Sequence, residues 1–312
     1  MEERRPIEPV AYQRISCMKL VNIALLSFAS VAFLGLAAVG CGSSDSSSGT
    51  ASDDTLGTSE AQLVTDDSDS STTDDSLESG VDEPLSGATT DNPGAPGSGK
   101  TVEEVLAAVK ANAATFFLPA GCLTSAADGD KITHVFKDCT GPYGMKTFNG
   151  TITSTYAVAG DGKITITHAA DGFTANGATI SGERVATYTD AGSVWTKTRT
   201  GNWSGSTASG KTLSHDASFV TTYDTSTKCL TRDGSAQSTI GSRSFERTVN
   251  GYKRCGIGLG GCPEAGELTL STTKSSTTTT LKIDFEGGVK YSVTRPNGRV
   301  IQRALVCNPL AT

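Results

Sequence analysis

Apolar and polar residues alternate along most of the chain after Cys122. In KTFNGTITSTYAV (146–158), Phe148, Ile152 and Tyr156 share one parity and threonines fill the other. The same period of two recurs in KTLSHDASFVTTYD (211–224) and LKIDFEG (281–287). This alternation is typical of strands with one buried and one exposed face. We therefore expect about twelve strands, with the many threonines on outward faces rather than in a reactive site.

Turn signals separate many of these runs. Asn-Gly and Asp-Gly pairs favour the positive backbone dihedrals of tight hairpins. Neighbouring strands joined by such hairpins predict a mainly β, antiparallel meander, which could be a sandwich, an open barrel or one curved sheet. The pairs are Asp161-Gly162, Asp171-Gly172, Asn176-Gly177, Asp233-Gly234, Asn250-Gly251 and Asn297-Gly298.

One amphipathic helix precedes the strands, at about 102–117. Thr101 and Glu104 have the spacing of a capping box, and Val102, Val105, Leu106, Val109 and Ala113 fall on one helical face. Pro119 and Gly121 follow and end the helix. We expect this helix to cap the sheet of a single domain spanning 101–312.

An apolar run near the start ends at a cysteine. The segment MKLVNIALLSFASVAFLGLAAVGC (18–41) has a basic start, an apolar core and small residues before Cys41, the layout of a secretory signal. Its end resembles the lipobox of bacterial lipoproteins, in which the cysteine carries the lipid. We predict a signal peptide over 1–40, with 1–17 a mis-called extension, and lipidation of Cys41. The resemblance implies a lipid anchor in the bacterial outer membrane, facing the periplasm or the cell surface.

Residues 41–100 differ sharply in charge from the rest. Gly42 to Lys100 holds 13 Asp and Glu residues and one Lys, whereas 101–312 has a net charge of +4. The acidic stretch is rich in Ser, Thr and Asp and has few large apolar residues. Such composition cannot offset the entropy of ordering, so we expect a disordered tether between the lipid and the β-domain. A net +4 without a basic run argues against a nucleic-acid partner.

Six cysteines lie within the predicted domain, an even number in an exported chain, which favours three disulfides over a metal site. Proximity predicts Cys122 with Cys139. Pairing of Cys229 with Cys255 and of Cys262 with Cys307 would join the later strands, and a bridge between Cys255 and Cys262 is the alternative. We expect neither a metal nor a cofactor.

Two sets of residues are candidates for a site. Trp195, Lys197, Arg199 and Trp203 share a parity, so an unbroken strand would place two indoles and two cations on one face. That face could bind a sugar or an anionic polymer, although two core tryptophans with cations at the rim fit the pattern better. The histidines His134, His168 and His215 each lie in a predicted strand, and we interpret His215 as structural.

Three stretches of the domain carry a resemblance to known sequences. They are FKDCTGPYGMKTFNGTITSTY (136–156) and the pair ERTVNGYKRCG (246–256) and GCPEAGELTL (261–270). They resemble a group of uncharacterised lipoproteins from myxobacteria and related bacteria, over roughly 120–307. The resemblance implies a secreted, Thr-rich β-domain with paired cysteines and carries no activity.

Two hypotheses for function follow. The favoured one is a non-catalytic, lipid-anchored envelope protein that displays a β-domain for a glycan or protein partner, or for a structural role; a lipid carrier is a variant that needs an apolar concave face. The alternative is an envelope hydrolase acting on glycans, with carboxylates that converge only in the fold. Its candidates are Asp216, Asp224, Asp284 and Glu286.

Overall fold

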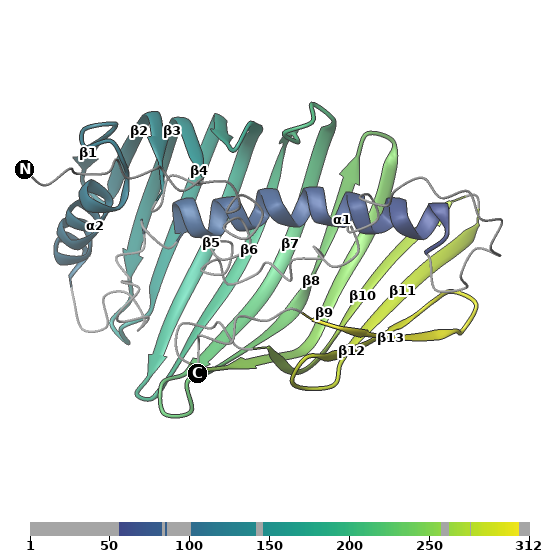
Figure 1. Ribbon diagram of the computed structural model, residues 1–312. Coiled ribbons are helices and arrows are strands. Elements are labelled where there is room, and N and C mark those ends of the chain that lie inside the picture. Colours follow the sequence, from purple (N-terminus) through teal and green to yellow (C-terminus); the bar gives the residue numbers. More distant parts are fainter. Residues whose placement is uncertain are drawn as a thin grey trace, which may run out of the picture.

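The computed structural model describes residues 56–82, 85, 101–141, 146–256, 262–274 and 276–305. Within these residues the chain forms one 13-stranded antiparallel sheet in which every strand pairs with its neighbours in sequence. The expected meander is confirmed, and of the three predicted forms it is the open, curved sheet, with β1 and β13 at its edges (Figure 1). The strands are β1 (Leu123–Asp128), β2 (Lys131–Thr140), β3 (Thr147–Val158), β4 (Ile164–Ala175), β5 (Ala178–Ala191), β6 (Val194–Ser206), β7 (Thr212–Asp224), β8 (Cys229–Ile240), β9 (Arg243–Cys255), β10 (Pro263–Lys274), β11 (Thr277–Phe285), β12 (Lys290–Thr294) and β13 (Val300–Ala304).

The predicted turns are only half correct. Asn176-Gly177 joins β4 to β5 as expected, whereas Asp171-Gly172 and Asp233-Gly234 lie inside β4 and β8. Asn250-Gly251 likewise lies inside β9. The pairing register shifts at each of these three places, which marks β-bulges rather than hairpins. Bulges bend a strand and increase its twist, so the same dipeptides that suggested turns here curve the sheet.

Two glycines lie directly opposite an aromatic residue on the neighbouring strand. A Cβ on Gly182 would come within 2.6 Å of the Trp203 Cα, and a Cβ on Gly234 within 2.7 Å of the Phe219 Cα. Both glycines have positive φ angles, 140° and 145°. No larger residue fits these positions without moving the partner strand.

The face of the sheet toward α1, called here the inner face, holds the core. Along β7 the alternation is strict: Leu213, Ala217 and Phe219 are buried on the inner face, while Ser214 and Asp216 are exposed on the outer face. Apolar side chains are buried along the whole inner face, including Trp203 and Leu213 on its middle strands. At the β1 end, Phe117, Phe136, Phe148 and Phe173 form an aromatic cluster, and at the other end Leu268, Leu270, Leu281 and Ile283 are buried.

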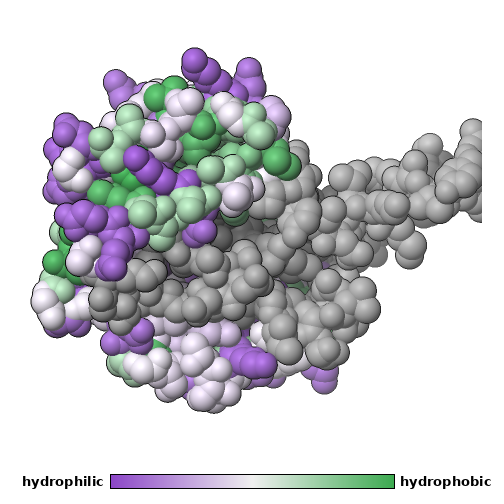
Figure 2. All heavy atoms as spheres, turned by 90° about the vertical axis from the view of Figure 1, so that its left-hand side faces the viewer, coloured by the Kyte–Doolittle hydropathy of each residue, from purple (hydrophilic) through white to green (hydrophobic). Residues whose placement is uncertain are grey.

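The predicted capping helix is present as α2 (Val102–Phe116). Its capping box is complete, with Thr101 N donating to Glu104 Oε2 at 2.8 Å and Glu104 N donating to Thr101 Oγ1 at 3.3 Å. The predicted apolar face is buried against the β1 end of the sheet. Figure 2 looks onto this end, where apolar and charged residues are interspersed.

Two of the predicted disulfides are confirmed. Cys122 is bonded to Cys139, and Cys229 to Cys255, its direct cross-strand partner. The alternative bridge between Cys255 and Cys262 is therefore excluded, and Cys262 is itself disulfide-bonded. Glu264 lies near Cys229 and Cys255, but sulfurs committed to a disulfide are not thiolate ligands for a metal. Cys307, Cys41 and the signal segment 1–40 lie outside the described residues, so those predictions are untested.

The prediction of a disordered tether is wrong for part of its length. Thr58–Leu77 forms a helix, α1, which continues into a π-helical turn, η2 (Glu78–Asp82). The two elements, called here the acidic segment, lie across the strands on the inner face (Figure 1). No helix among the described residues is both long enough and apolar enough to span a membrane.

Candidate functional site: a cationic trough under the acidic segment

The acidic segment crosses the sheet in a regular order. Asp67 lies beside Arg247 on β9, Asp74 beside Arg199 on β6, and the carbonyl of Leu85 accepts a hydrogen bond from Tyr156 on β3. The helix thus runs from the later strands toward the earlier ones. One helical turn rises about 5.4 Å and neighbouring strands are about 4.8 Å apart, so each turn advances the segment by about one strand.

Every acidic side chain described in the segment has a cationic neighbour on the sheet or its connections. These neighbours form the wall and floor of a trough on the inner face, called here the cationic trough. The pairs are Glu60 with Arg295, Asp66 with Arg243, Asp67 with Arg247, Asp69 with Lys211, Asp74 with Arg184 and Arg199, Glu78 with Lys197, Arg199 and Arg232, and Asp82 with Arg184 and Lys197.

The tightest part of the trough lies over β5 and β6. Glu78 accepts hydrogen bonds from Lys197 Nζ at 2.9 Å and from Arg199 Nη1 at 2.8 Å. The second guanidinium nitrogen of Arg199 donates to Asp74 Oδ2 at 2.5 Å, so one arginine joins two carboxylates one turn apart. Arg184 Nη2 lies 3.0 Å from Asp82 Oδ2. All of these side chains are buried, which makes each charge dependent on its partners.

Burial and charge act in opposite directions on these carboxyls. Burial raises the pKa of Asp74, but Arg199 and Arg184 outweigh it, and its pKa lies below the usual range. Glu78 behaves in the same way: burial raises its pKa, and Lys197 and Arg199 bring it well below normal. At Asp67 burial dominates and the pKa is raised, with Arg247 only partly offsetting it. The centre of the trough therefore holds its carboxylates ionised more firmly than the β9 end does.

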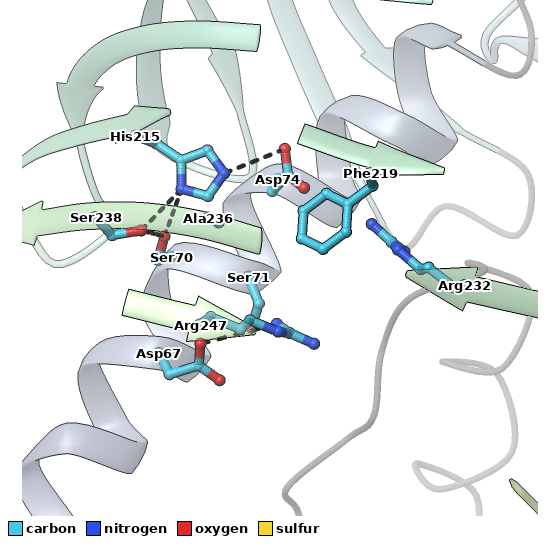
Figure 3. A pocket seen from close by; sticks show the side chains of 10 residues that line it. All are labelled: Asp67, Ser70, Ser71, Asp74, His215, Phe219, Arg232, Ala236, Ser238 and Arg247. Carbon is cyan, nitrogen blue, oxygen red and sulfur yellow. Dashed lines mark hydrogen bonds and ion pairs between the residues drawn. The ribbon is translucent and has the colours of Figure 1, made fainter. Parts of the chain in front are cut away.

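A small polar pocket lies between the segment and β7 to β9 (Figure 3). His215 Nδ1 is 2.8 Å from Ser238 Oγ and 3.1 Å from Ser70 Oγ, and its Nε2 is 3.7 Å from Asp74. The residues are those of a serine hydrolase triad, yet the Asp74 contact is beyond hydrogen-bond distance and two hydroxyls share one ring nitrogen. Burial lowers the pKa of His215 to about 4, which makes it a weak base at neutral pH. The pocket has room for about one water molecule.

The other two histidines repeat this arrangement. His134 Nδ1 is 2.8 Å from Ser125 Oγ, and His168 Nδ1 is 2.8 Å from Ser154 Oγ. Burial lowers the pKa of His134 to about 3 and that of His168 to about 4. All three histidines are buried on the inner face, in line with the structural interpretation of His215. Each is held neutral by the dry face that it helps to fill.

The predicted stripe on β6 exists, but it is not an open surface. Trp195, Lys197, Arg199 and Trp203 lie on one face of an unbroken strand. That face is the inner one, and all four side chains are buried, between 2% and 8% exposed. The prediction that the cations lie at the rim is wrong. Lys197 and Arg199 lie beneath the acidic segment and bind its carboxylates.

The predicted hydrolase carboxylates do not converge. Asp216 and Asp224 belong to β7, while Asp284 is on β11 and Glu286 follows that strand. Three strands separate the two pairs. Asp216 and Glu286 are exposed.

Sequence reasoning missed the acidic segment and most of its cationic partners. A signal was nevertheless present, because buried positions along the segment recur every three or four residues. Carboxylates and hydroxyls share this face with leucine and valine, so a search for apolar periodicity does not detect it. The buried positions are Glu60, Leu63, Val64, Asp66, Asp67, Ser70, Thr73, Asp74, Ser76, Leu77, Glu78, Val81 and Asp82.

No protein family model matches this chain, and neither the curated proteins nor the solved structures contain a match. The resemblance to myxobacterial lipoproteins therefore remains a prediction. Function must be inferred from the chemistry of the trough itself.

Proposed function

We propose that this chain is a lipid-anchored outer-membrane protein whose β-domain is a non-catalytic binding module. Cys41 carries the lipid, and the cationic trough is the binding site. The trough binds carboxylate-rich polypeptide, and its occupant in this structure is the chain's own acidic segment.

One observation carries the proposal: the trough makes a helix out of a sequence with little tendency to form one. Of the 20 residues in α1, 14 are Ser, Thr or Asp, which favour caps and turns over helix interiors. Hydroxyls of Thr65, Thr73 and Ser76 donate to the carbonyls four residues earlier, which leaves the carboxylates to the sheet. The helix is thus the bound form of a segment whose conformation the trough determines.

The other hypotheses have less support. A lipid carrier needs an apolar concave face, whereas the middle of this inner face carries Arg184, Lys197, Arg199 and Arg232. For the hydrolase, the serine, histidine and aspartate that meet at Ser70 are buried and poorly aligned. We therefore favour binding over catalysis.

Cleavage of the connection tests the binding function. A specific protease site is inserted between Asp91 and Lys100 of the full chain, and the cut protein is passed over a sizing column at 50 mM and at about 1 M salt. We expect the two pieces to elute together at low salt and to separate more readily at high salt. If the two pieces separate at low salt although the sheet remains folded, the trough is not a binding site.

Lipid labelling tests the anchor independently. Cells of a Gram-negative host receive an alkyne fatty acid, and wild type is compared with Cys41→Ala. We expect labelling of wild type alone, and protease treatment of intact cells then reports surface exposure. Equal labelling of both proteins would remove the anchor from the proposal without affecting the trough.

A further inference from the structure

We infer that the trough also binds acidic helical segments of other polypeptides, and that the chain's own acidic segment is a resident occupant which such a ligand displaces. The inference rests on the proposed function, because it requires the trough to be a binding site. The ligand is a helix of about six turns with carboxylates and aliphatic side chains on one face.

The spacing of the cations selects a helix rather than an extended chain. From Asp67 at Arg247 on β9 to Asp82 at Arg184 on β5 the segment advances 15 residues, or roughly 22 Å of helix, while four strand spacings measure roughly 19 Å. In an extended chain, side chains on one face recur about every 6.6 Å and would lose this match within a few strands. A ligand with carboxylates at successive helical turns meets cations of the same or the next strand, as Asp74 and Glu78 do at Arg199 on β6.

The apolar contacts select a polypeptide over a polysaccharide or polyphosphate. Leu63 and Val64 are buried near one end of the segment, and Leu77 and Val81 near the other. All four belong to the same hydrophobic core as the sheet. A simple polyanion offers charge to the arginines but nothing to replace these side chains. The trough therefore recognises a pattern of charge and aliphatic surface together.

The resident segment is suited to being displaced. Its sequence is a poor helix former, and buried ion pairs contribute little net stability once desolvation is counted. Its main advantage over a free ligand is its covalent connection to the β-domain, which corresponds to an effective concentration of about a millimolar. A partner with better helix-forming residues, or one concentrated at the same membrane surface, can overcome that advantage.

Binding of a labelled peptide to the full chain tests this. The probe is a fluorescent peptide with the sequence of residues 56–85, and the receptor carries Asp74→Asn and Glu78→Gln to loosen its resident segment. Asp128→Asn with Asp216→Asn removes two exposed charges elsewhere and serves as the matched control. Competitors are a shuffled peptide of the same composition, polyphosphate and polygalacturonate.

We expect the loosened receptor to bind the native-sequence peptide at least about tenfold more tightly than the control receptor does, and about tenfold more tightly than it binds the shuffled peptide. If the shuffled peptide and the polyanions bind as tightly as the native-sequence peptide, the trough does not recognise a helix. The proposal that it binds anions would then still stand. If no anion binds although hydrogen exchange shows the resident segment released, both proposals fail.

Exchange in the cleaved wild-type protein covers the case in which the double variant does not fold. After cleavage between Asp91 and Lys100, the bound fragment is challenged with excess labelled peptide. We expect the label to enter the complex as the fragment leaves. A complex that never exchanges over days would overturn displacement.

Discussion

The two α-helices in the described part of the chain form for different reasons. The helix α2 has a complete capping box and an apolar face, so its local sequence and its packing agree. The helix α1 has neither, and its buried face mixes carboxylates, hydroxyls and a few aliphatic residues. The first helix is specified largely by its own 15 residues and the Thr101 cap, whereas the second depends on cations supplied by β5, β6, β8 and β9.

The difference predicts that the two helices respond to different perturbations. Loss of charge in the trough should release α1 and leave α2 in place, while loss of a cap or a disulfide at the β1 end should do the reverse. Hydrogen exchange measures the amide protection of both helices in one sample. In each variant below, α1 can therefore be compared directly with α2.

The largest effect is expected from Arg199→Met. The change leaves Asp74 and Glu78 buried without their shared arginine, and breaking a buried ion pair in this way costs about 3–5 kcal/mol. We expect hydrogen exchange in 58–82 to rise strongly, with little change in 102–116. Lys282→Met, which removes half-exposed pairs with Glu267 and Asp284, is the control and should leave both regions unchanged. Equal protection of 58–82 in both variants would disprove the dependence of α1 on the trough.

The next effect concerns the opposite end of the sheet. Cys122→Ser with Cys139→Ser opens a bridge across 17 residues and should cost about 3 kcal/mol of unfolding free energy. Because the bridge lies beside α2 and Phe117, exchange in 102–116 should rise more than exchange in 58–82. Chemical denaturation of wild type and variant measures the loss. An unchanged midpoint would mean that the bridge contributes nothing to this end.

A smaller effect is expected from mild acid. Burial lowers the pKa of His168 and of His215 to about 4, with Asp82 and Asp74 respectively raising it in part, against about 6.5 in water. Each therefore stabilises the docked state fully above pH 6.5, and this is lost as the pH falls toward 4. At pH 5.5 the loss is roughly 1–1.5 kcal/mol per histidine.

Several other charged groups surround each histidine, and their effect on the pH dependence differs from that of the histidine. Arg184 and Lys197 also face His168, and Arg199, Arg184 and Arg247 face His215; all of them keep their charge in this range. The pKa values of Asp74 and Glu78 are lowered. The stability that these carboxylates contribute to the docked state is therefore lost only as the pH falls below their ordinary pKa, near 4. His215→Gln should reduce the pH dependence of exchange in 58–82 between pH 7.5 and 5.5. An unaltered profile would assign the effect to other groups.

The smallest effect is expected from Thr101→Ala. Removal of the capping hydroxyl should cost about 1 kcal/mol and fray the first turn of α2. Exchange should rise around 102–105 alone. Thr101→Ser retains the hydroxyl and should restore protection, and a rise in 58–82 would show that the two helices are coupled.

The sequence by itself determined those features that arise from local pattern. Period-two alternation predicted the strands and their buried parity, the spacing of Thr101 and Glu104 predicted α2, and proximity predicted the bridge from Cys122 to Cys139. These succeed because each depends on neighbouring residues and on burial of apolar side chains, both of which can be seen along the chain.

Tertiary structure alone decided the trough. Asp-Gly and Asn-Gly pairs fit both hairpins and bulges, and only long-range pairing placed three of them inside strands. The acidic segment was predicted to be disordered because its few large apolar residues, taken alone, cannot offset the entropy cost of ordering it. That cost is offset by cations more than 100 residues away, such as Arg199 for Asp74, and no local pattern contains this pairing.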